Sequence, residues 1–412
     1  MLSHCPERWS RDCLKVGGRT PNLLPGAAFG APAGRSRLVG MTSSETLAGG
    51  IRPRPVVGRL PRYAAGKPPV AVDGLASYKL SSNENPLPPI PAVVEAIARQ
   101  TDFNRYPDPL SSKLRAALAE FLGVPAEDIV TGAGSLGALN QLLTTFAGQN
   151  DDGKADEVIY AWRSFEAYPI SVGLAGAESV RIPLTADGRH DLDAMAAAVT
   201  VRTRVILLCT PNNPTGPILT TAETERFIQA VPTDVVVVID EAYQEFVRAQ
   251  DAVDGIAMYR KYPNVVVLRT FSKAHGLAGL RVGYSVSNPE LTQHLRVAAT
   301  PFAVSQIAEQ AAIVSLQNYP QVVERVQSLV DERDRVTAGL RDLGWFVPEA
   351  QGNFVWLDLG VNSGEFAELA GSQALSVRAF GNEGVRVSIG EVEANTRFLR
   401  LCADYTKPPR RS

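Results

Sequence analysis

The sequence predicts an α/β protein in which a mostly parallel sheet is covered by helices on both faces, with a smaller second domain after it. Two observations support this class. Short apolar runs rich in β-branched residues alternate with helical patterns along the chain, which is typical of parallel strands joined by crossover helices. Three of these runs contain almost no polar residue, as expected of strands buried on both faces.

The individual elements follow from these patterns in chain order. Buried strands are expected at Val205–Cys209, Val235–Ile239 and Val265–Leu268, and shorter strands at Phe354–Leu359 and Val385–Ile389. Helical periodicity predicts helices at Ala92–Arg99, Ser112–Leu122, Gly137–Phe146, Leu192–Val199, Thr221–Val231 and, longest of all, Gln321–Asp342.

These elements predict how the domains are divided. Residues 1–50 have no periodic apolar face, and the first forty hold six Lys or Arg against two acids. We expect a disordered extension or a start upstream of the true one at Met41, with a transit peptide as the alternative. An N-terminal arm is expected at 51–80, a large domain at 81–304, a small domain at 305–405 and a loose tail at 406–412.

The composition excludes several classes of protein. The chain of 412 residues has a net charge of −2, which gives no electrostatic reason to bind nucleic acid or an anionic membrane. It contains no apolar run of the roughly 20 residues that a membrane span requires. Its four cysteines lack metal-ligand spacing, and Cys209 is expected to be a small buried apolar residue. We therefore expect a cytoplasmic protein without a metal site.

Lys273 lies in Thr270-Phe-Ser-Lys-Ala-His-Gly-Leu-Ala-Gly-Leu-Arg281, directly after an expected buried strand. A lysine amine that is partly removed from water loses its proton more readily and can form a Schiff base with an aldehyde. A phosphate could accept hydrogen bonds from Ser272 and from the charged fork of Arg281. The segment indicates pyridoxal 5'-phosphate held on Lys273, although a chain with 41 Lys and Arg could place these residues together by chance.

Asp240 strengthens this interpretation. It ends an apolar strand, where an unpaired carboxylate is costly, and a protonated pyridine nitrogen would be a suitable partner. The other possibility is that Asp240 caps the next helix. Ligands of open α/β sheets gather at the carboxyl ends of strands, so Asn213 and Tyr243, which follow neighbouring strands, should face the same crevice. The loop Gly132-Ala-Gly-Ser-Leu-Gly137 could add backbone N–H groups for a phosphate.

Taken in order, Asn213-Pro-Thr-Gly, Asp240-Glu-Ala-Tyr and Ser272-Lys with Arg281 resemble the motifs of fold type I pyridoxal-phosphate aminotransferases. Three further segments resemble the class-II branch that contains histidinol-phosphate and aromatic aminotransferases: Leu80-Ser-Ser-Asn-Glu-Asn-Pro86, Asn104-Arg-Tyr-Pro-Asp108 and Gly384-Val-Arg-Val-Ser-Ile-Gly390. The resemblance covers roughly residues 52–405. It implies a central sheet of the seven-stranded type.

The resemblance also implies a role for each matching residue. Lys273, Asp240 and Tyr243 would be the catalytic residues. Lys273 would hold the cofactor and move a proton once the substrate amine displaces it. Asp240 would pair with the ring nitrogen, Asn213 and Tyr243 with the ring oxygen, and Phe165 would stack on the ring.

The remaining roles concern the phosphate and the substrate. The resemblance implies that the phosphate is held by Ser135, Leu136 and Gly137 through their backbone and by Ser272, Arg281 and, from the other subunit of a homodimer, Tyr106. Arg386 would clasp the α-carboxylate of the substrate, and Asn83 and Asn353 are expected near the substrate.

The substrate is less strongly indicated than the cofactor. The string Trp162-Arg-Ser-Phe-Glu-Ala-Tyr-Pro169 is similar to the aromatic amino acid branch, and Phe302 and Phe354 could line an apolar pocket. Arg378 is the one feature that could serve a substrate phosphate instead, and His275 replaces a more usual Tyr or Phe. We predict transfer of the α-amino group between Phe, Tyr or Trp and a 2-oxo acid such as 2-oxoglutarate. Histidinol-phosphate transamination and a decarboxylase or lyase reaction are the alternatives.

Overall fold

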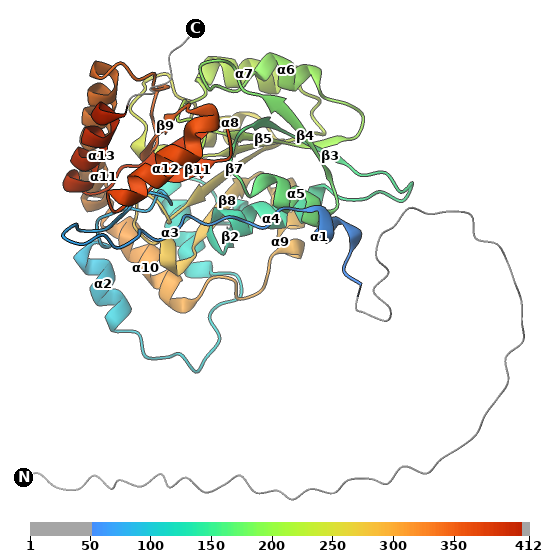
Figure 1. The fold of residues 1–412 in the computed structure, drawn as a ribbon. Coiled ribbons are helices and arrows are strands. Elements are labelled where there is room, and N and C mark those ends of the chain that lie inside the picture. Colours follow the sequence, from blue (N-terminus) through green and yellow to red (C-terminus); the bar gives the residue numbers. More distant parts are fainter. Residues whose placement is uncertain (1–51, 406–412) are drawn as a thin grey trace, which may run out of the picture. The chain divides into compact units, whose positions relative to one another are not determined.

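The structure is a computed structural model that describes residues 52–405 (Figure 1). The predictions for 1–50 and for the tail at 406–412 concern residues outside this range. Pro53 and the described residues after it form one compact unit. Within 52–405, no helix is long and apolar enough to cross a membrane.

A seven-stranded sheet forms the centre of this unit, which confirms the predicted α/β class. All its neighbouring strands pair in parallel except at β8, which is antiparallel to both β2 and β7. The order across the sheet is β2 (Ile129–Gly132), β8 (Gly283–Ser287), β7 (Val265–Thr270), β6 (Val236–Asp240), β5 (Thr203–Cys209), β3 (Glu157–Trp162) and β4 (Glu178–Pro183).

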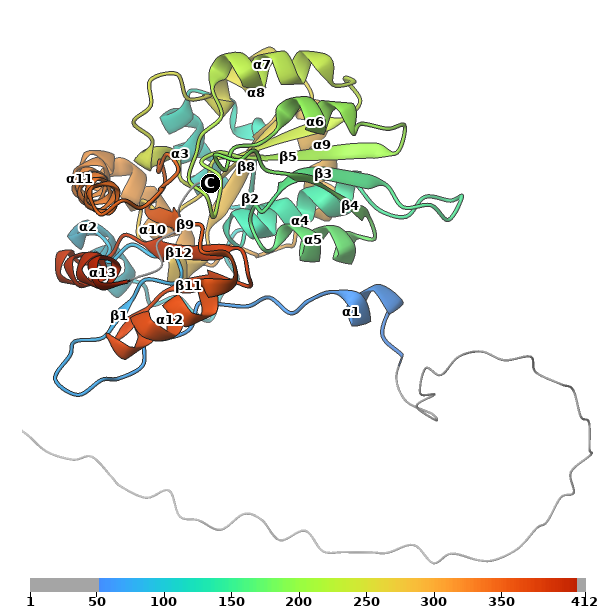
Figure 2. The same ribbon diagram turned by 45° about the horizontal axis from the view of Figure 1, so that its top comes forward.

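Alternate residues of each central strand pack into two separate cores, one on each face of the sheet. In β5, Val205 and Leu207 belong to one core, while Ile206 and Leu208 belong to the other. Both sets are buried, because helices cover both faces (Figure 2). One face is covered by α4 (Gly134–Phe146), α5 (Tyr168–Ala175) and α9 (Pro289–Ala298), and the other by α3 (Ser112–Leu122), α6 (Leu192–Ala197), α7 (Thr221–Ala230) and α8 (Gly255–Lys261).

Local sequence signals set several of the helix ends. Thr220 and Glu223 form a reciprocal capping box at the start of α7, and the side chain of Asp191 caps α6. Gly123 ends α3 in the left-handed conformation that glycine adopts without strain.

A second, three-stranded antiparallel sheet lies beyond the central one, in the order β11 (Arg378–Phe380), β12 (Gly384–Ser388) and β9 (Phe354–Leu357). The helices α11 (Tyr319–Asp342), α12 (Ser363–Ser372) and α13 (Val392–Asp404) accompany it (Figure 1). The other elements are α1 (Pro55–Arg59), α2 (Pro91–Ala98), α10 (Gln306–Gln317), the short strands β1 (Tyr78–Lys79) and β10 (Leu375–Ser376), and four 3₁₀ turns, at Ala126–Asp128, Gln244–Phe246, Ala278–Leu280 and Gly360–Asn362.

The pairing of β1 with β10 positions the segment that follows β1. These strands are parallel, and Leu80 continues the pairing through hydrogen bonds with Ser376 and Ser388. Residues 81–84 are thereby held between the two sheets. The predicted domain boundary at 304/305 falls between α9 and α10 and stays a prediction.

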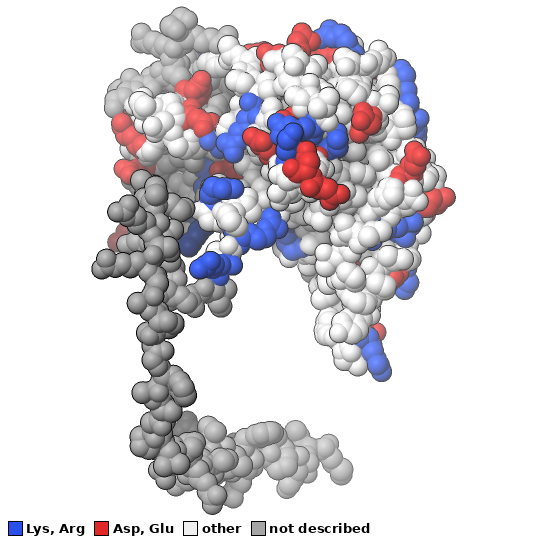
Figure 3. All heavy atoms as spheres, turned by 90° about the vertical axis from the view of Figure 1, so that its right-hand side faces the viewer, with Lys and Arg blue, Asp and Glu red and all other residues white. Residues whose placement is uncertain are grey.

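Each helix and strand expected from the sequence is present; α3 has the predicted ends, and the other elements differ from the prediction at one or both ends. The largest shift that affects the site is at α4, which begins at Gly134 and not at the predicted Gly137. On the molecular face shown in Figure 3, Lys and Arg side chains are interspersed with Asp and Glu side chains among uncharged surface.

Candidate active site

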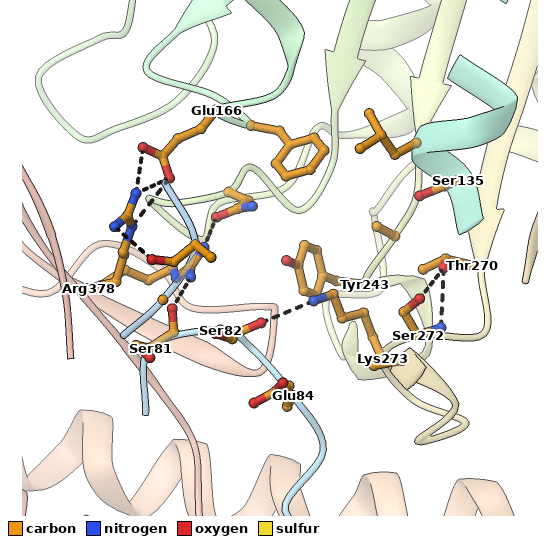
Figure 4. A pocket seen from close by; sticks show the side chains of 18 of the residues that line it. Ser81, Ser82, Glu84, Ser135, Glu166, Tyr243, Thr270, Ser272, Lys273 and Arg378 are labelled. Atoms are coloured by element: carbon orange, nitrogen blue, oxygen red, sulfur yellow. Dashed lines mark hydrogen bonds and ion pairs between the residues drawn. The ribbon is translucent and has the colours of Figure 1, made fainter. Parts of the chain in front are cut away.

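The carboxyl ends of β5, β6 and β7 open onto a cavity of about 330 Å³, of the size that small-molecule ligands occupy. Its wall combines polar groups from the strand ends with residues of the N-terminal arm and of the three-stranded sheet (Figure 4). Of the predicted site residues, it includes Ser135, Leu136, Phe165, Asn213, Asp240, Tyr243, Ser272, Lys273, Arg281 and Arg386. The structure thus brings together ten residues chosen from the sequence.

Lys273 extends into this cavity from the turn after β7 (Figure 4). Its Nζ donates hydrogen bonds to the backbone oxygens of Ser82, at 3.3 Å, and Asn83, at 3.2 Å. Burial lowers the pKa of the Lys273 amine to about 7, and the positive charge of Arg386 acts in the same direction. A large fraction of this amine is therefore neutral, and nucleophilic, near neutral pH.

Asp240, at the end of β6, is buried in the wall of the same cavity. Its Oδ2 accepts a hydrogen bond of 2.7 Å from the hydroxyl of Tyr168, whereas its Oδ1 has no partner in the described chain. Burial raises the pKa of the Asp240 carboxyl to about 6, and the bond from Tyr168 opposes that rise. An unpartnered buried oxygen is costly, so this carboxylate is suited to a donor from a ligand.

Arg386, on β12, places its guanidinium beside Asn213 in the cavity wall. Its guanidinium donates to Asn213 Oδ1 at 2.7 Å and to the Ser81 backbone oxygen at 2.8 Å. Its Nε is buried without a partner in the described chain. Tyr243 lies nearby, where its hydroxyl accepts a hydrogen bond of 3.0 Å from Asn83.

Ser272, Arg281 and the start of α4 form a small polar cradle at one end of the cavity. Arg281 donates a hydrogen bond of 3.1 Å to Ser272 Oγ and reaches toward the Ala133 carbonyl at 3.4 Å. The Arg281 guanidinium packs so closely against Gly134 that a Cβ there would clash with it, and glycine also adopts the φ of 76° at this position without strain. Helix N-termini bind anions through free N–H groups, and here an arginine and a hydroxyl stand beside one.

The earlier start of α4 corrects the expectation for Gly137. The N–H groups without an intrahelical partner are those of the first turn, which begins at Gly134. The N–H of Gly137 is consequently part of the helical pattern, and Gly137 does not line the cavity. Ser135 and Leu136 do line it, so the predicted backbone cradle lies slightly earlier in the chain.

The aromatic residues divide into those that line the cavity and those that do not. Phe165 lines it, together with Phe380 and Tyr63, which the sequence did not single out. Phe354 is fully buried behind Tyr243, with ring centroids 5.1 Å apart, and Phe302 lies on the surface. The expectation that Phe302 and Phe354 line the pocket is wrong for the described chain.

Tyr106 lies outside the cavity. It is 84 % exposed, and its ring stacks on Phe302 with centroids 4.8 Å apart. The structure contains one chain, so the expected contribution of Tyr106 to a partner's site stays a prediction.

Asn83 and Asn353 lie one layer behind the cavity wall. Asn83 has a left-handed backbone with φ of 52°, and its side chain joins the Tyr243 hydroxyl to Ser388. Asn353 donates to the Asn83 backbone oxygen at 3.2 Å. Both residues support the segment to which Lys273 is hydrogen-bonded, and their predicted place near the substrate stays a prediction.

The two residues whose roles the sequence left open are now placed. His275 is buried on the far side of the lysine turn, where its Nδ1 lies 2.8 Å from Ser315 Oγ. Burial lowers the pKa of His275 to about 4. Arg378 lines the cavity and forms an ion pair with Glu166 at 2.8 Å. Sequence reasoning missed Glu166 and Tyr168 as site residues, although both lie in the aromatic string that contains Phe165.

Comparison with known proteins agrees with this fold. The family model described as aminotransferase class I and II matches residues 77–408. An aromatic amino acid aminotransferase of Streptomyces avermitilis is 53% identical over 349 residues, which are 84% of this chain and 96% of the relative. A protein of the same name from Thermobifida fusca is 48% identical over 86% of this chain and 97% of its own length.

Solved structures show the same architecture. The histidinol-phosphate aminotransferase from Sinorhizobium meliloti, solved in complex with pyridoxal-5'-phosphate, is 28% identical and superposes with a TM-score of 0.75. The match covers 87% of this chain and 97% of that one. The fold and the cavity with its part-buried lysine therefore define an enzyme of the pyridoxal-phosphate-dependent aminotransferase class. Within that class, the chain belongs to the aminotransferase class I and II family.

Proposed function

We propose that this protein transfers the α-amino group between an aromatic amino acid and a 2-oxo acid such as 2-oxoglutarate, with pyridoxal phosphate held covalently on Lys273. One observation supports the reaction above the others: Lys273 and Asp240 line the same cavity, and among residues 52–405 nothing forms a hydrogen bond with Oδ1 of that buried carboxylate. The name of the relatives that are 48% and 53% identical supports the aromatic substrate. So do Phe165, Phe380 and Tyr63 in the cavity wall.

The residues present fit the cofactor. The buried Oδ1 of Asp240 would accept a hydrogen bond from the ring nitrogen, and the carboxylate would keep that nitrogen protonated. The phosphate would be held by Arg281, Ser272 and the first turn of α4, where a Cβ on Gly134 would displace the Arg281 guanidinium. Asn213 and Tyr243 would hold the ring oxygen, and Phe165 would lie against the ring.

When bound, the cofactor accepts into its ring the electrons released at the substrate's Cα. The chain supplies binding and proton transfer. Arg386 would bind the substrate carboxylate with its planar fork, which fixes the Cα relative to Lys273. The Lys273 amine, with its pKa near 7, would take the Cα proton and return it at the other end of the reacting system.

The functional unit in this proposal is a cytoplasmic homodimer, in which Tyr106 of each chain reaches the phosphate in the partner's site. The support for this part is the exposure of the Tyr106 and Phe302 rings, which stack on one another at the surface. Exposed aromatic pairs are typical of interaction surfaces.

A panel of amino acceptors tests the substrate assignment. The purified enzyme, loaded with pyridoxal phosphate and with glutamate as donor, is given phenylpyruvate or imidazole acetol phosphate, and the amino products are quantified. We expect phenylalanine to form at the higher kcat/KM. If phenylpyruvate is inert while imidazole acetol phosphate turns over, the aromatic assignment is wrong and histidinol-phosphate transamination replaces it.

A further inference from the structure

Two arginines on neighbouring strands of the small sheet line the cavity but differ in their partners. Arg378 on β11 is paired in register with Arg386 on β12, and both belong to the cavity wall. The ring of Phe380 lies against both, at 5.3 Å from the Arg378 guanidinium carbon and 5.6 Å from that of Arg386. Two adjacent guanidinium groups would be expected to attract a ligand with two anionic groups.

Arg386 keeps its net charge available. Its partners are two neutral oxygens, from Asn213 and Ser81, and among residues 52–405 no carboxylate forms an ion pair with it. Its buried Nε also has no hydrogen-bond partner in the described part of the chain. This arginine is accordingly suited to the single carboxylate that every amino acid or 2-oxo acid carries.

Arg378 is already neutralised by Glu166. The Glu166 carboxylate accepts hydrogen bonds from Arg378 Nη2 at 2.8 and 3.0 Å and from Nε at 3.3 Å (Figure 4). Only 13% of the Arg378 side chain and 25% of the Glu166 side chain are exposed. The pair is therefore screened less by solvent than an ordinary surface pair.

Glu166 is held in place by its neighbours in the chain. It follows Phe165, which lines the cavity, and precedes by two residues Tyr168, which is bonded to Asp240. A loop fixed at both sides presents the Glu166 carboxylate to Arg378, so the negative charge belongs to the cavity wall.

We propose that Glu166 is a specificity-determining residue. By neutralising Arg378, it leaves the cavity with one available cationic clasp, so substrates with one anionic group and an uncharged aromatic side chain are favoured. A second anion, whether a phosphate or a side-chain carboxylate, must displace Glu166 from Arg378 or lie beside its negative charge, and binds less well. This inference rests on the proposed aminotransferase function and concerns its choice of substrate.

Removal of the Glu166 charge tests the proposal. We would measure kcat and KM of wild type and Glu166→Gln for phenylalanine, glutamate and histidinol phosphate. In Glu166→Gln, kcat/KM for the two substrates with a second anion should rise relative to that for phenylalanine by roughly tenfold or more, mainly through KM, because like charges brought together strongly disfavour a ligand. Glutarate, an unreactive diacid, should inhibit the variant at correspondingly lower concentration.

A neighbouring ion pair provides the matched control. Arg163 and Glu383 form a second arginine–glutamate pair beside Phe380, but neither residue lines the cavity. Glu383→Gln removes the same charge from a pair whose arginine also lies against Phe380, and it should leave the substrate ratio as in wild type.

A second variant separates specificity from structure. Arg378→Gln leaves Glu166 without its cation and should lower the relative kcat/KM for glutamate and histidinol phosphate. The double variant Glu166→Gln/Arg378→Gln should return the ratio toward that of wild type. If Glu166→Gln changed all three substrates equally, or Arg378→Gln left the ratio unchanged, the pair would only be structural and the proposal would be overturned. Failure of wild type to transaminate phenylalanine would instead refute the proposed function.

Discussion

Tyr168 donates a 2.7 Å hydrogen bond to Oδ2 of Asp240, while Oδ1 of that buried carboxylate has no partner among residues 52–405. The bond from Tyr168 fixes the orientation of the carboxylate, since it holds one of the two oxygens in place. Asp240 and Tyr168 come from different elements, β6 and the start of α5. The protein thus maintains a costly buried group, which is typical of a functional site.

Replacement of Asp240 by Asn should separate function from stability. The variant keeps the side-chain shape but loses the charge that would hold the ring nitrogen protonated, so kcat should fall by roughly 10²-fold or more, the scale for loss of a preorganised electrostatic group. The melting temperature of the cofactor-free protein should stay the same or rise, because burial already disfavours the charged carboxyl. Steady-state kinetics and calorimetry check the two parts. A fall in melting temperature with kcat unchanged would contradict both.

Gly134→Ala should weaken cofactor binding. Gly134 has φ of 76°, and an added Cβ would clash with the Arg281 guanidinium, which is proposed to hold the phosphate. We expect the dissociation constant for pyridoxal phosphate to rise by about tenfold or more, equivalent to at least ~1.4 kcal/mol. Fluorescence titration of the cofactor-free protein measures it. Gly279→Ala is the control, because a Cβ there would meet no atom within 4 Å; equal affinity losses in both variants would argue against the cradle.

Cofactor uptake should accelerate as the pH rises through about 7. Burial lowers the pKa of Lys273 to that value, and only the neutral amine attacks an aldehyde. The unfolded chain keeps this proton up to about 10.5, so above pH 7 it binds more protons than the folded chain at this residue. The contribution of Lys273 to the free energy of unfolding should therefore increase between pH 7 and 10.5.

Stopped-flow absorbance of cofactor-free protein mixed with pyridoxal phosphate measures the uptake rate. Nα-acetyl-lysine, mixed with the cofactor under the same conditions, corrects for titration of the cofactor itself. A midpoint for the protein close to that of the free lysine would show that the amine is not perturbed.

Subunit mixing tests the role of Tyr106. Lys273→Ala and Tyr106→Ala homodimers should each have low activity, whereas a heterodimer should contain one site with both defects and one with neither. Random mixing should then restore about a quarter of wild-type activity if the sites are shared in a symmetric dimer. Activity after refolding of the mixed chains checks this. No gain over the separate variants, or a monomer in sedimentation, would exclude a shared site.

The sequence predicted the site residues that lie at the ends of consecutive buried strands. Asp240 and Lys273 each lie at or just after a buried strand, and adjacent parallel strands bring their ends together. This is why strand patterns alone placed them in one crevice. The start of α4 was predicted three residues late, because glycine is a poor helix former and the glycines at 132, 134 and 137 weaken the helical signal there.

Other parts depend on contacts between distant segments. Ser82 and Asn83 reach Lys273 because β1 pairs with β10, nearly the whole length of the fold away in sequence. The pairing of Glu166 with Arg378 likewise joins the large sheet's loop to the small sheet. No local pattern identifies which of many charged residues will form a pair. The partners of Arg378 and Arg386 were therefore found only in the structure.

The attachment of the cofactor to Lys273 is the central claim, and its most direct test is chemical. The enzyme loaded with pyridoxal phosphate is reduced with borohydride, digested and analysed by mass spectrometry, with Lys273→Ala treated in parallel. We predict one reduced adduct, on the peptide that contains Lys273, and none in the variant. A reducible linkage that persists in Lys273→Ala, or an adduct on another lysine of the wild type, would contradict the account.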